Sequence, residues 1–500
     1  MDKQGQTIGT SIVMKFVERF GTQIVNIVLN IILARLLAPE DYGVLAILNV
    51  FVVLAQVISQ NGINNALIQK EKPDELDYST ALCVSLAIAS GIYILLFAFA
   101  HPIAEFYSMP QIALYLRVLA LELFPGAVCA IYNAMVMKNM QFRIVMVTGV
   151  IANTSSCVLG VIAAYCGFGI WALIISQMSA TIILLVSMMI MVKEKLLIRF
   201  SKQRASSLMG YGNKIIVASI IDNLYYDVEG LLIGKILSKE VLGFFTNART
   251  YPLRVVSSIK DTIAGVVFPA LSNEQKDIHR MKEIDRKAIQ VFSFIMFPML
   301  FGFAAVSKEF VYILLTEKWL PCLFPMQAFS IGFASLALSA PNIQVIKATG
   351  KSDLNLKIEV VRKSIIFGGL ILSAFVWGKI EAIAIASAGT TIATALLVAA
   401  VGGRIISFSL IEQMKAIAKN IVATSGMMLA IYITSVLTPE EMFGMVTLLL
   451  KIMVGVIAYV LIAVITRNES LQMILNKGKT LLVLASGEKN HSGSIENNQF

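Results

Sequence analysis

Long apolar runs alternate with short polar breaks along almost the whole chain. Each run has about the twenty residues that an α-helix needs to cross a bilayer, and the runs recur until about residue 466. The pattern predicts an all-α integral membrane protein with about fourteen transmembrane helices. Their ranges are roughly 11–36, 43–67, 79–101, 112–137, 144–166, 169–192, 210–236, 242–270, 288–314, 321–347, 357–378, 380–402, 415–437 and 443–466.

A polar knot separates the first two runs. The stretch "ILARLLAPEDYGVLAI", from Ile32 to Ile47, places charged residues and a proline within a few positions of one another. Pro39 cannot continue the preceding helix, while Glu40 and Asp41 suit the N-terminus of the next one. The knot is therefore predicted to be a tight extracellular turn, with gating as the alternative.

Composition excludes a soluble protein. Of 500 residues, 57% are hydrophobic and only 14% are charged, too few to cover the surface of a water-soluble chain of this length. The net charge of +10 raises nucleic-acid binding as a question. The basic residues fall between the apolar runs and form no basic domain, so nucleic acid is not an expected partner.

The basic residues orient the predicted helices. With the N-terminus inside, the loops and tails on that side carry 27 Lys and Arg residues, and the other side carries six. This bias predicts a multi-pass membrane protein with both termini in the cytoplasm, and so an even number of spans.

An internal repeat suggests how the helices are grouped. The segment "ARLLAPEDYGVLA" from Ala34 aligns at an offset of 200 with "GKILSKEVLGFFT" from Gly234. A second pair of motifs, "YNAMVMKNMQFR" and "PNIQVIKATGKS", follows in the same order. The offset contains an even number of spans, so the copies are parallel. We expect two six-helix bundles related by a pseudo-two-fold axis along the membrane normal, plus two C-terminal helices, enclosing a central cavity.

The corresponding domain boundaries follow from the runs. The segments are an N-terminal six-helix bundle (1–192), a basic cytoplasmic loop (193–209), a C-terminal six-helix bundle (210–402), two extra transmembrane helices (415–466) and a partly disordered cytoplasmic tail (467–500).

Polar residues form stripes along several predicted spans. At about 100° per residue, Lys15, Arg19, Asn26 and Asn30 share one face of the first span. The second span carries Asn49, Gln56, Gln60 and Asn64 in the same way. Polar groups facing lipid cost several kcal/mol, so these faces are expected to meet protein or water. Hydrogen bonds between helices and a water-filled cavity are the two interpretations.

The residues of the second half carry a family resemblance. In "NLYYDVEGLLIGKILSKEVLGFFTNARTYPLRVVSSIKDTIAGVVFPALSNEQKD", an acid precedes a "GK-L" turn by about eight residues, and "NAR" and "FPALS" follow. Together with the knot, this resembles the polysaccharide (O-antigen type) flippases of the multidrug/oligosaccharidyl-lipid/polysaccharide exporter superfamily. Phe244 stands where that family often has a tyrosine. The resemblance implies a protein of the bacterial cytoplasmic (inner) membrane. It also implies transfer of a polyprenyl-pyrophosphate-linked oligosaccharide from the inner to the outer leaflet, for O-antigen, capsule or exopolysaccharide.

Such a cargo needs cations for its pyrophosphate and amides, hydroxyls and aromatic faces for its glycan. Arg249 and Lys260 have a second interpretation, snorkelling to an interface. The expected cationic residues are Arg19, Arg249, Arg254, Lys15, Lys214 and Lys260; the expected glycan-binding residues are Asn26, Asn30, Asn49, Gln56, Gln60 and Tyr226.

Four acidic residues lie within predicted spans and are candidates for ion coupling. They are Asp222, Asp227, Glu229 and Glu122. Intramembrane carboxylates can carry H⁺ or Na⁺, and pairing with a neighbouring arginine is the alternative. Asp227 is the acid that matches the family's position, so the resemblance gives it the most weight.

No enzymatic constellation is visible in the sequence. The five cysteines form no CxxC pair, the three histidines are not placed as ligands or bases, and no GxxxxGK[ST] motif is present. We expect no catalytic residues, metal or cofactor. Membrane lipid and glycan polymerase machinery are the other expected partners.

Two alternative functions are considered. A multidrug/cation antiporter of the same superfamily would require a more acidic and aromatic cavity. A membrane-embedded glycan polymerase or acyltransferase would require larger outer loops.

Overall fold

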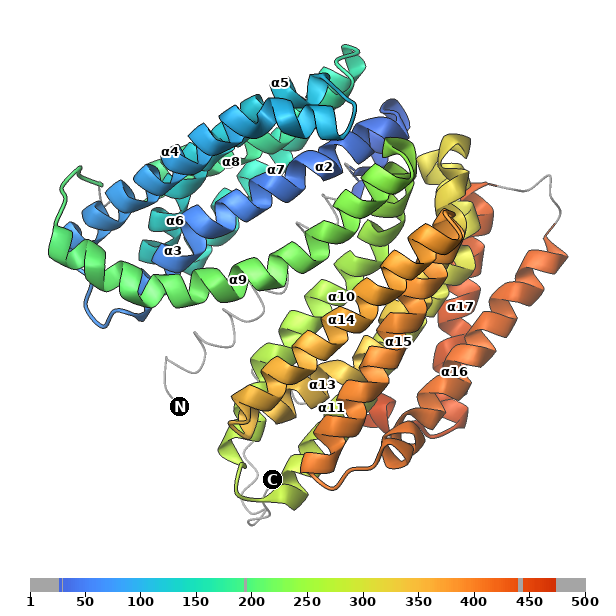
Figure 1. Ribbon diagram of the computed structural model, residues 1–500. Coiled ribbons are helices and arrows are strands. Elements are labelled where there is room, and N and C mark those ends of the chain that lie inside the picture. The colour runs from blue at the N-terminus through green and yellow to red at the C-terminus, as the bar shows by residue number, and fades with distance from the viewer. Residues whose placement is uncertain (1–26, 29, 193–195, 439–443, 474–500) are drawn as a thin grey trace, which may run out of the picture. The chain divides into compact units, whose positions relative to one another are not determined.

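Every regular element in the described part of the chain is a helix. The computed structural model describes residues 27–28, 30–192, 196–438 and 444–473 (Figure 1). Ten helices of this part are long and apolar enough to cross a membrane. Many of their large side chains are exposed, among them Ile94, Leu95 and Phe99 on one helix. An apolar outer surface of this extent is typical of helices that face lipid.

The structure divides into two compact units. The first comprises Met1–Arg254, Ser307–Phe329 and Val360–Thr390, and the second Val255–Val306, Ser330–Glu359 and Thr391–Phe500.

Most helices of the first unit come from the N-terminal half of the chain. They are α2 (Pro39–Gln56), the π-helix η1 (Val57–Asn61), α3 (Gly62–Gln69), α4 (Glu75–Phe106), α5 (Gln111–Leu119), the 3₁₀-helix η2 (Ala120–Glu122), α6 (Leu123–Lys138), α7 (Phe142–Tyr165), α8 (Ile170–Met191) and α9 (Lys202–Ile236). α7 and α8 lie side by side, and α9 runs along α2 and α3 (Figure 1).

The remaining helices contribute to one or both units. They are α10 (Lys239–Asn273), α11 (Ile278–Glu309), η3 (Phe310–Leu315), η4 (Glu317–Cys322), α12 (Leu323–Ala334), α13 (Leu336–Ala348), α14 (Ser352–Val376), α15 (Ile380–Ile405), α16 (Leu410–Leu437) and α17 (Met445–Ile465). α16 and α17 pack against each other as a hairpin within the second unit (Figure 1).

The predicted helix start at the knot is confirmed. α2 begins at Pro39, and the Asp41 carboxylate accepts a hydrogen bond of 3.1 Å from the backbone N–H of Ala38. The first backbone N–H groups of a helix have no partner within the helix. Proline has no such N–H at the first position, and the Asp41 carboxylate pairs with the N–H of Ala38.

A lysine and a tryptophan of one short segment hold the chain before the knot. The Lys318 ammonium donates to the carbonyl oxygens of Arg35 and Leu37, and the Trp319 indole donates to that of Ala34. The Trp319 ring is fully buried and meets the ring of Tyr42 edge-on, 5.3 Å between centroids. The knot is therefore a packed junction within the first unit.

The two repeat motifs contact each other at their glycines. A Cβ added to Gly43 would overlap the carbonyl oxygen of Lys239, and a Cβ added to Gly243 would overlap that of Pro39. The contact is reciprocal, since each added Cβ would also lie 3.2–3.3 Å from the other glycine's backbone nitrogen. Only glycine lets the starts of α2 and α10 approach this closely.

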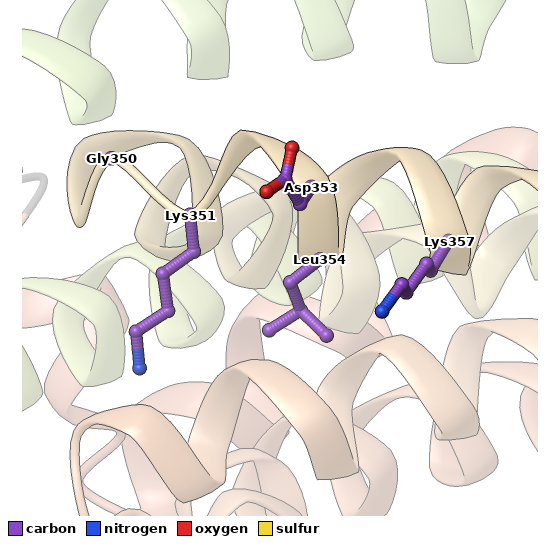
Figure 2. Close-up of a pocket in the computed structure, with 5 residues that line it drawn as sticks. All are labelled: Gly350, Lys351, Asp353, Leu354 and Lys357. Atoms are coloured by element: carbon purple, nitrogen blue, oxygen red, sulfur yellow. The ribbon is translucent and has the colours of Figure 1, made fainter.

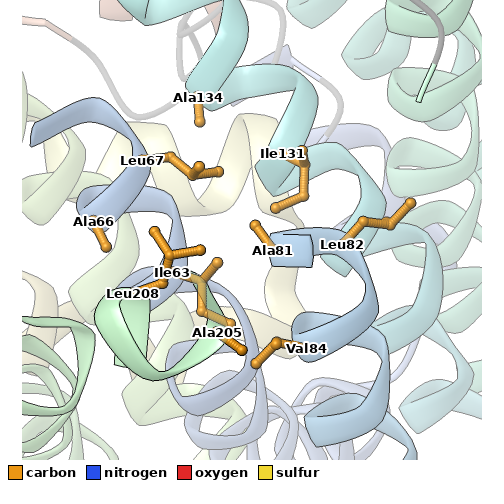
Figure 3. Close-up of a cluster of buried hydrophobic side chains, with 10 residues drawn as sticks. All are labelled: Ile63, Ala66, Leu67, Ala81, Leu82, Val84, Ile131, Ala134, Ala205 and Leu208. Carbon is orange, nitrogen blue, oxygen red and sulfur yellow. The ribbon is translucent and has the colours of Figure 1, made fainter. Parts of the chain in front are cut away.

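An apolar cluster fixes α3, α4, α6 and α9 at one end of the first unit (Figure 3). It includes Ile63 and Leu67 of α3, Leu82 of α4 and Ile131 of α6, with Leu208 from α9. Small residues between these large ones allow the helices to interdigitate. This cluster positions the polar faces of α3 and α6.

A group of charged residues lies beside that cluster. The Asp77 carboxylate, 1% exposed, pairs with Lys70 at 2.5 Å and with Arg204 at 2.9 Å, and Arg204 also pairs with Asp74. Asp74 and Asp77 cap the start of α4 reciprocally. The hydrogen bonds to both carboxylates raise the pKa of the Arg204 guanidinium. These pairs join α9 to the loop between α3 and α4.

A buried polar network joins α11, α16 and the chain after α17 in the second unit. The Asn420 side chain donates to Ser293 Oγ and to the Gln290 carbonyl, and the Asn468 amide donates to Asn420 Oδ1. Ser470 Oγ also donates to the Gln290 carbonyl. These bonds attach the segment after α17 to the body of the second unit.

Candidate functional site

The helices of the first unit line a partly open polar cavity of about 510 Å³. Six carboxamide side chains lie on its wall, together with the carboxylate of Glu122 and the hydroxyl of Thr181. The lining residues are Gln56, Gln60, Asn61, Asn64, Glu122, Gly126, Cys129, Ala130, Asn133, Val145, Gly149, Asn153, Thr181, Leu184 and Met188. Its volume lies within the range of roughly 300–1,000 Å³ that is usual for small-molecule sites.

A π-helix explains why so many amides of the second span reach one cavity. On a regular helix, Gln56, Gln60 and Asn64 share a face but Asn61 turns away by about a further 100°. η1 interposes a π turn over Val57–Asn61, between α2 and α3. Such turns insert a residue into an α-helix and occur frequently at functional sites. Asn61 then joins the other three amides on the cavity wall.

Glu122 is held in the cavity by neutral donors. Its side chain is buried at the end of η2. Thr181 Oγ1 donates to Oε1 at 2.5 Å, Gln177 Nε2 donates to Oε2 at 3.1 Å, and Gln56 provides a third side-chain hydrogen bond. Among the lining residues, Glu122 is the one formally charged group. The structure thus places Glu122 next to Gln56 and Gln60.

Glu229 has a different environment. Its Oε2 lies 2.6 Å from Arg249 Nη1, and both side chains are largely buried. This ion pair joins α9 to α10 within the first unit. It matches the alternative interpretation of the acids, pairing with a neighbouring arginine, and it balances the charge of one predicted cargo-binding cation.

Several predicted site residues lie outside the cavity or outside the described part. Asn49 lies on α2 with its Oδ1 buried, Arg254 is half-buried near Tyr251 and Cys157, and Lys260 is exposed on α10. Asn30 is half-buried in the helix before the knot. Lys15, Arg19 and Asn26 lie outside the described residues, as do the side chains of Lys214, Asp222, Tyr226 and Asp227.

Sequence reasoning missed several lining residues. The sequence pattern does not single out Asn61, Asn153 or Thr181, and Asn133 stands out only as part of the repeat motif "YNAMVMKNMQFR". Asn153 and Thr181 are single polar positions in apolar spans, which is a weak signal by itself. A polar residue within a span is nevertheless unusual, so a search for intramembrane carboxamides would have found Asn153.

A second, shallower pocket of about 310 Å³ lies in the second unit where α13 turns into α14. Lys351, Leu354 and Lys357 extend to the same side of α14, and Asp353 points the other way (Figure 2). The pocket contains none of the predicted binding residues.

Comparison with known proteins identifies the family. A match to the family described as "Polysaccharide biosynthesis protein" covers residues 32–324, more than half of the chain. The chain belongs to this polysaccharide biosynthesis protein family. The matched range includes the knot, the amide-lined cavity and the Glu229–Arg249 pair, and it confirms the resemblance to polysaccharide flippases of the exporter superfamily.

Relatives within this family have names from cell-surface polysaccharide synthesis. The chain is 21% identical over 441 residues to the teichuronic acid biosynthesis protein TuaB of Bacillus subtilis, covering 85% of this chain and 89% of TuaB. It is 23% identical over 357 residues to the lipopolysaccharide biosynthesis protein WzxC of Escherichia coli, covering 70% of this chain and 71% of WzxC.

The fold is that of a solved flippase. The lipid II flippase MurJ in an inward closed conformation superposes with a TM-score of 0.72 over 91% of this chain and 99% of MurJ, at 15% identity. At that identity the likeness shows the fold alone. With the ten apolar helices of the described part, the family match supports a multi-pass inner-membrane protein.

Proposed function

We propose that this family member flips a polyprenyl-pyrophosphate-linked oligosaccharide from the inner to the outer leaflet of the cytoplasmic membrane. The observation that carries the proposal is the amide-lined cavity inside an apolar helical unit. Gathering six half-buried carboxamides within apolar helices is expensive unless they bind something polar. A glycan supplies hydroxyl groups that both donate to and accept from carboxamides.

The proposed route is alternating access between two parallel bundles. The reciprocal Gly43–Gly243 contact supports this arrangement, because residues near a two-fold axis meet their own counterparts. The predicted orientation, with both termini cytoplasmic, places this contact at the extracellular end.

The pyrophosphate is proposed to bind cations outside the amide cavity. Arg254 is the described residue best suited to this, because a guanidinium meets phosphate oxygens in pairs and Arg254 lies half-buried on α10. Arg249 can contribute only if its bond to Glu229 opens or leaves donors directed elsewhere. Lys15, Arg19, Lys214 and Lys260 remain predicted members of the same cationic set.

An ion gradient is the proposed energy source. Asp222, Asp227 and Glu229 on α9 and Glu122 in η2 remain the candidates for binding H⁺ or Na⁺. Glu229 is the weakest of the described candidates, because its charge is already balanced by Arg249. We propose no catalytic step, cofactor or metal for this chain, and glycan polymerase machinery as a neighbouring partner.

A leaflet-resolved assay tests the proposed function. Deleting the gene should trap polyprenyl-pyrophosphate-linked oligosaccharide on the cytoplasmic side. The wild-type gene should release it, whereas Arg254→Ala should not. Arg117→Ala is the matched control, because the Arg117 guanidinium lies 4.2 Å from the Phe97 ring and bonds the Phe97 carbonyl, away from the amide cavity.

Two other outcomes would redirect the interpretation. Normal distribution of lipid-linked sugar, with increased sensitivity to cationic dyes, would favour a multidrug/cation antiporter. Normal distribution with loss of polymerised glycan would favour a polymerase or acyltransferase.

A further inference from the structure

Two side chains that line the amide cavity each have a buried polar atom without a hydrogen-bond partner in the described part of the chain. Gln60 Nε2 and Asn64 Oδ1 are buried, and neither has a hydrogen-bond partner among the described residues. Leaving a buried polar group unpaired costs about 1–3 kcal/mol, so such atoms are rare in native structures. One is a donor and the other an acceptor. A ligand with several hydroxyl groups can supply partners of both kinds once these side chains turn toward the cavity, since each hydroxyl donates one hydrogen bond and accepts two.

The charge of the wall selects the class of ligand. No lysine or arginine lines the cavity in the described part of the chain, and Glu122 would repel an anion. The pyrophosphate of the proposed cargo is therefore unsuited to this cavity. A cation would have one carboxylate and otherwise neutral groups to bind to. An uncharged sugar ring, which presents several hydroxyls, fits the carboxamides and the volume of about 510 Å³.

The contacts of Glu122 favour a proton over a metal ion at this carboxylate. Hard cations require several oxygen ligands at roughly 2.3–2.6 Å. Gln177 directs its nitrogen, not its oxygen, at Glu122 Oε2, and Thr181 directs its hydroxyl hydrogen at Oε1. Both groups donate to the ionised carboxylate. A sodium ion would need them to turn away, whereas a proton needs only one carboxylate oxygen.

We propose that this cavity is a proton-linked site for an uncharged sugar unit of the cargo. The proposal rests on the proposed function and deepens it. In the ionised form, Glu122 has lone pairs left to accept hydrogen bonds from sugar hydroxyls. When a proton from cavity water binds Oε2, that oxygen becomes a donor facing the donor Gln177, so the carboxamide must turn and the sugar loses an acceptor. Sugar and proton therefore compete, which is the linkage an antiporter needs.

Few other titratable groups face Glu122. Cys129 of α6 lines the same cavity, and Arg117 of α5 is directed to the Phe97 ring of α4. The other charged or histidine side chains of the packed elements lie at helix ends: Glu40 and Asp41 on α2, Glu75, Asp77, His101 and Glu105 on α4, Lys138 on α6 and Arg143 on α7. α3 and α8 carry no charged residue. A pH response of this cavity is thus assigned to Glu122.

The first measurement is a pH titration of the full-length protein in lipid nanodiscs by infrared difference spectroscopy. The wild type should show a protonated-carboxyl band that Glu122→Gln lacks. The control Glu105→Gln, at the exposed end of α4, should keep the band. Thr181→Val removes a donor to the carboxylate and should move the titration of the band to higher pH. If Glu122→Gln keeps the band, the proposal is wrong.

The second measurement uses the glycan released from its lipid pyrophosphate as the probe. Its binding to the wild type should weaken at least about tenfold as Glu122 becomes protonated. Glu122→Gln should bind with little dependence on pH, and Glu122→Asp should restore the dependence. Tight binding at every pH by the wild type would contradict the proton linkage. No binding at any pH would contradict the sugar site.

These failures are separate from failure of the proposed function. The leaflet-resolved assay depends on Arg254 and on gene deletion, not on Glu122. Glu122→Gln could flip cargo normally, and collapse of the proton gradient could leave flipping unchanged in both this variant and the wild type. That result would overturn this inference and leave the proposed flippase function intact. If Glu122→Gln does not fold, Thr181→Val and Glu122→Asp still decide the titration.

Discussion

Gly43 and Gly243 lie at equivalent positions of the two repeat motifs and touch each other through their backbones. Each leaves room for a carbonyl oxygen of the other motif, that of Lys239 beside Gly43 and that of Pro39 beside Gly243. Residues 200 positions apart therefore share one reciprocal junction. A repeat that was inferred from spacing alone has a physical reason at these glycines, because any side chain would separate the two helix starts.

Replacing either glycine with alanine should loosen this junction. We expect Gly43→Ala and Gly243→Ala each to lower the free energy of unfolding by about 1–3 kcal/mol, the usual cost of overpacking. Thermal unfolding of the purified proteins in detergent measures this. Gly91→Ala is the control, since an added Cβ there meets open space. Equal stability of Gly43→Ala and Gly91→Ala would show that the junction opens at little cost.

The Arg249–Glu229 pair should be strongly coupled. Removing Arg249 leaves a buried carboxylate whose other oxygen already has no hydrogen-bond partner in the described part of the chain. Arg249→Ala is expected to cost about 3–5 kcal/mol, the typical effect of breaking a buried pair. Glu229→Gln in the same protein should recover much of that loss. A double-mutant cycle on unfolding measures the coupling, and additive losses would contradict it.

The ion pairs of Asp77 should stabilise the end of the first unit. Asp77→Asn weakens bonds to Lys70 and Arg204 and one bond of the α4 cap. Because both cations are partly exposed and can be solvated, the expected loss is about 1–3 kcal/mol, the value for hydrogen bonds to charged groups. Unfolding in detergent measures it against Glu105→Gln, whose carboxylate is exposed. A loss as small as that of the control would make the group dispensable.

Filling the cavity should reduce transport without unfolding the protein. A Cβ added at Gly126 would lie 2.5 Å from Gln60 Nε2, the end of a flexible side chain that can move aside. Gly126→Ala should therefore be tolerated, and Gly126→Leu should occupy the space. We expect the leucine variant to reach the membrane at normal levels and to flip at least about tenfold more slowly. Wild-type flipping by Gly126→Leu would exclude this cavity from the route.

The parts of the site that follow from sequence are those governed by one helix at a time. Pro39 starts α2 because of its own ring, and Gln56 and Gln60 share a face because of helix periodicity. Which helices bring Thr181 and Gln177 to Glu122 depends on the packing of apolar faces, and apolar helices of similar composition carry little information on which of them are neighbours. The Arg249–Glu229 pair likewise depends on how α9 and α10 rotate against each other.

The π-helix could not be predicted from the sequence, since its residues are ordinary in any α-helix. It also provides a sharp test of whether the cavity takes part in transport. A π turn is one residue inserted into an α-helix, so deleting Asn61 should restore a regular helix while α2 and α3 keep their packing faces, including Ile63 and Leu67 in the apolar cluster. We expect this deletion variant to fold and enter the membrane normally but to lose most flipping, because one amide leaves the wall. Asn65→Ala is the control, since Asn65 is exposed and its side chain donates to the Asn61 carbonyl. Normal flipping by the deletion variant would mean that the amides of η1 pack the bundle rather than bind cargo.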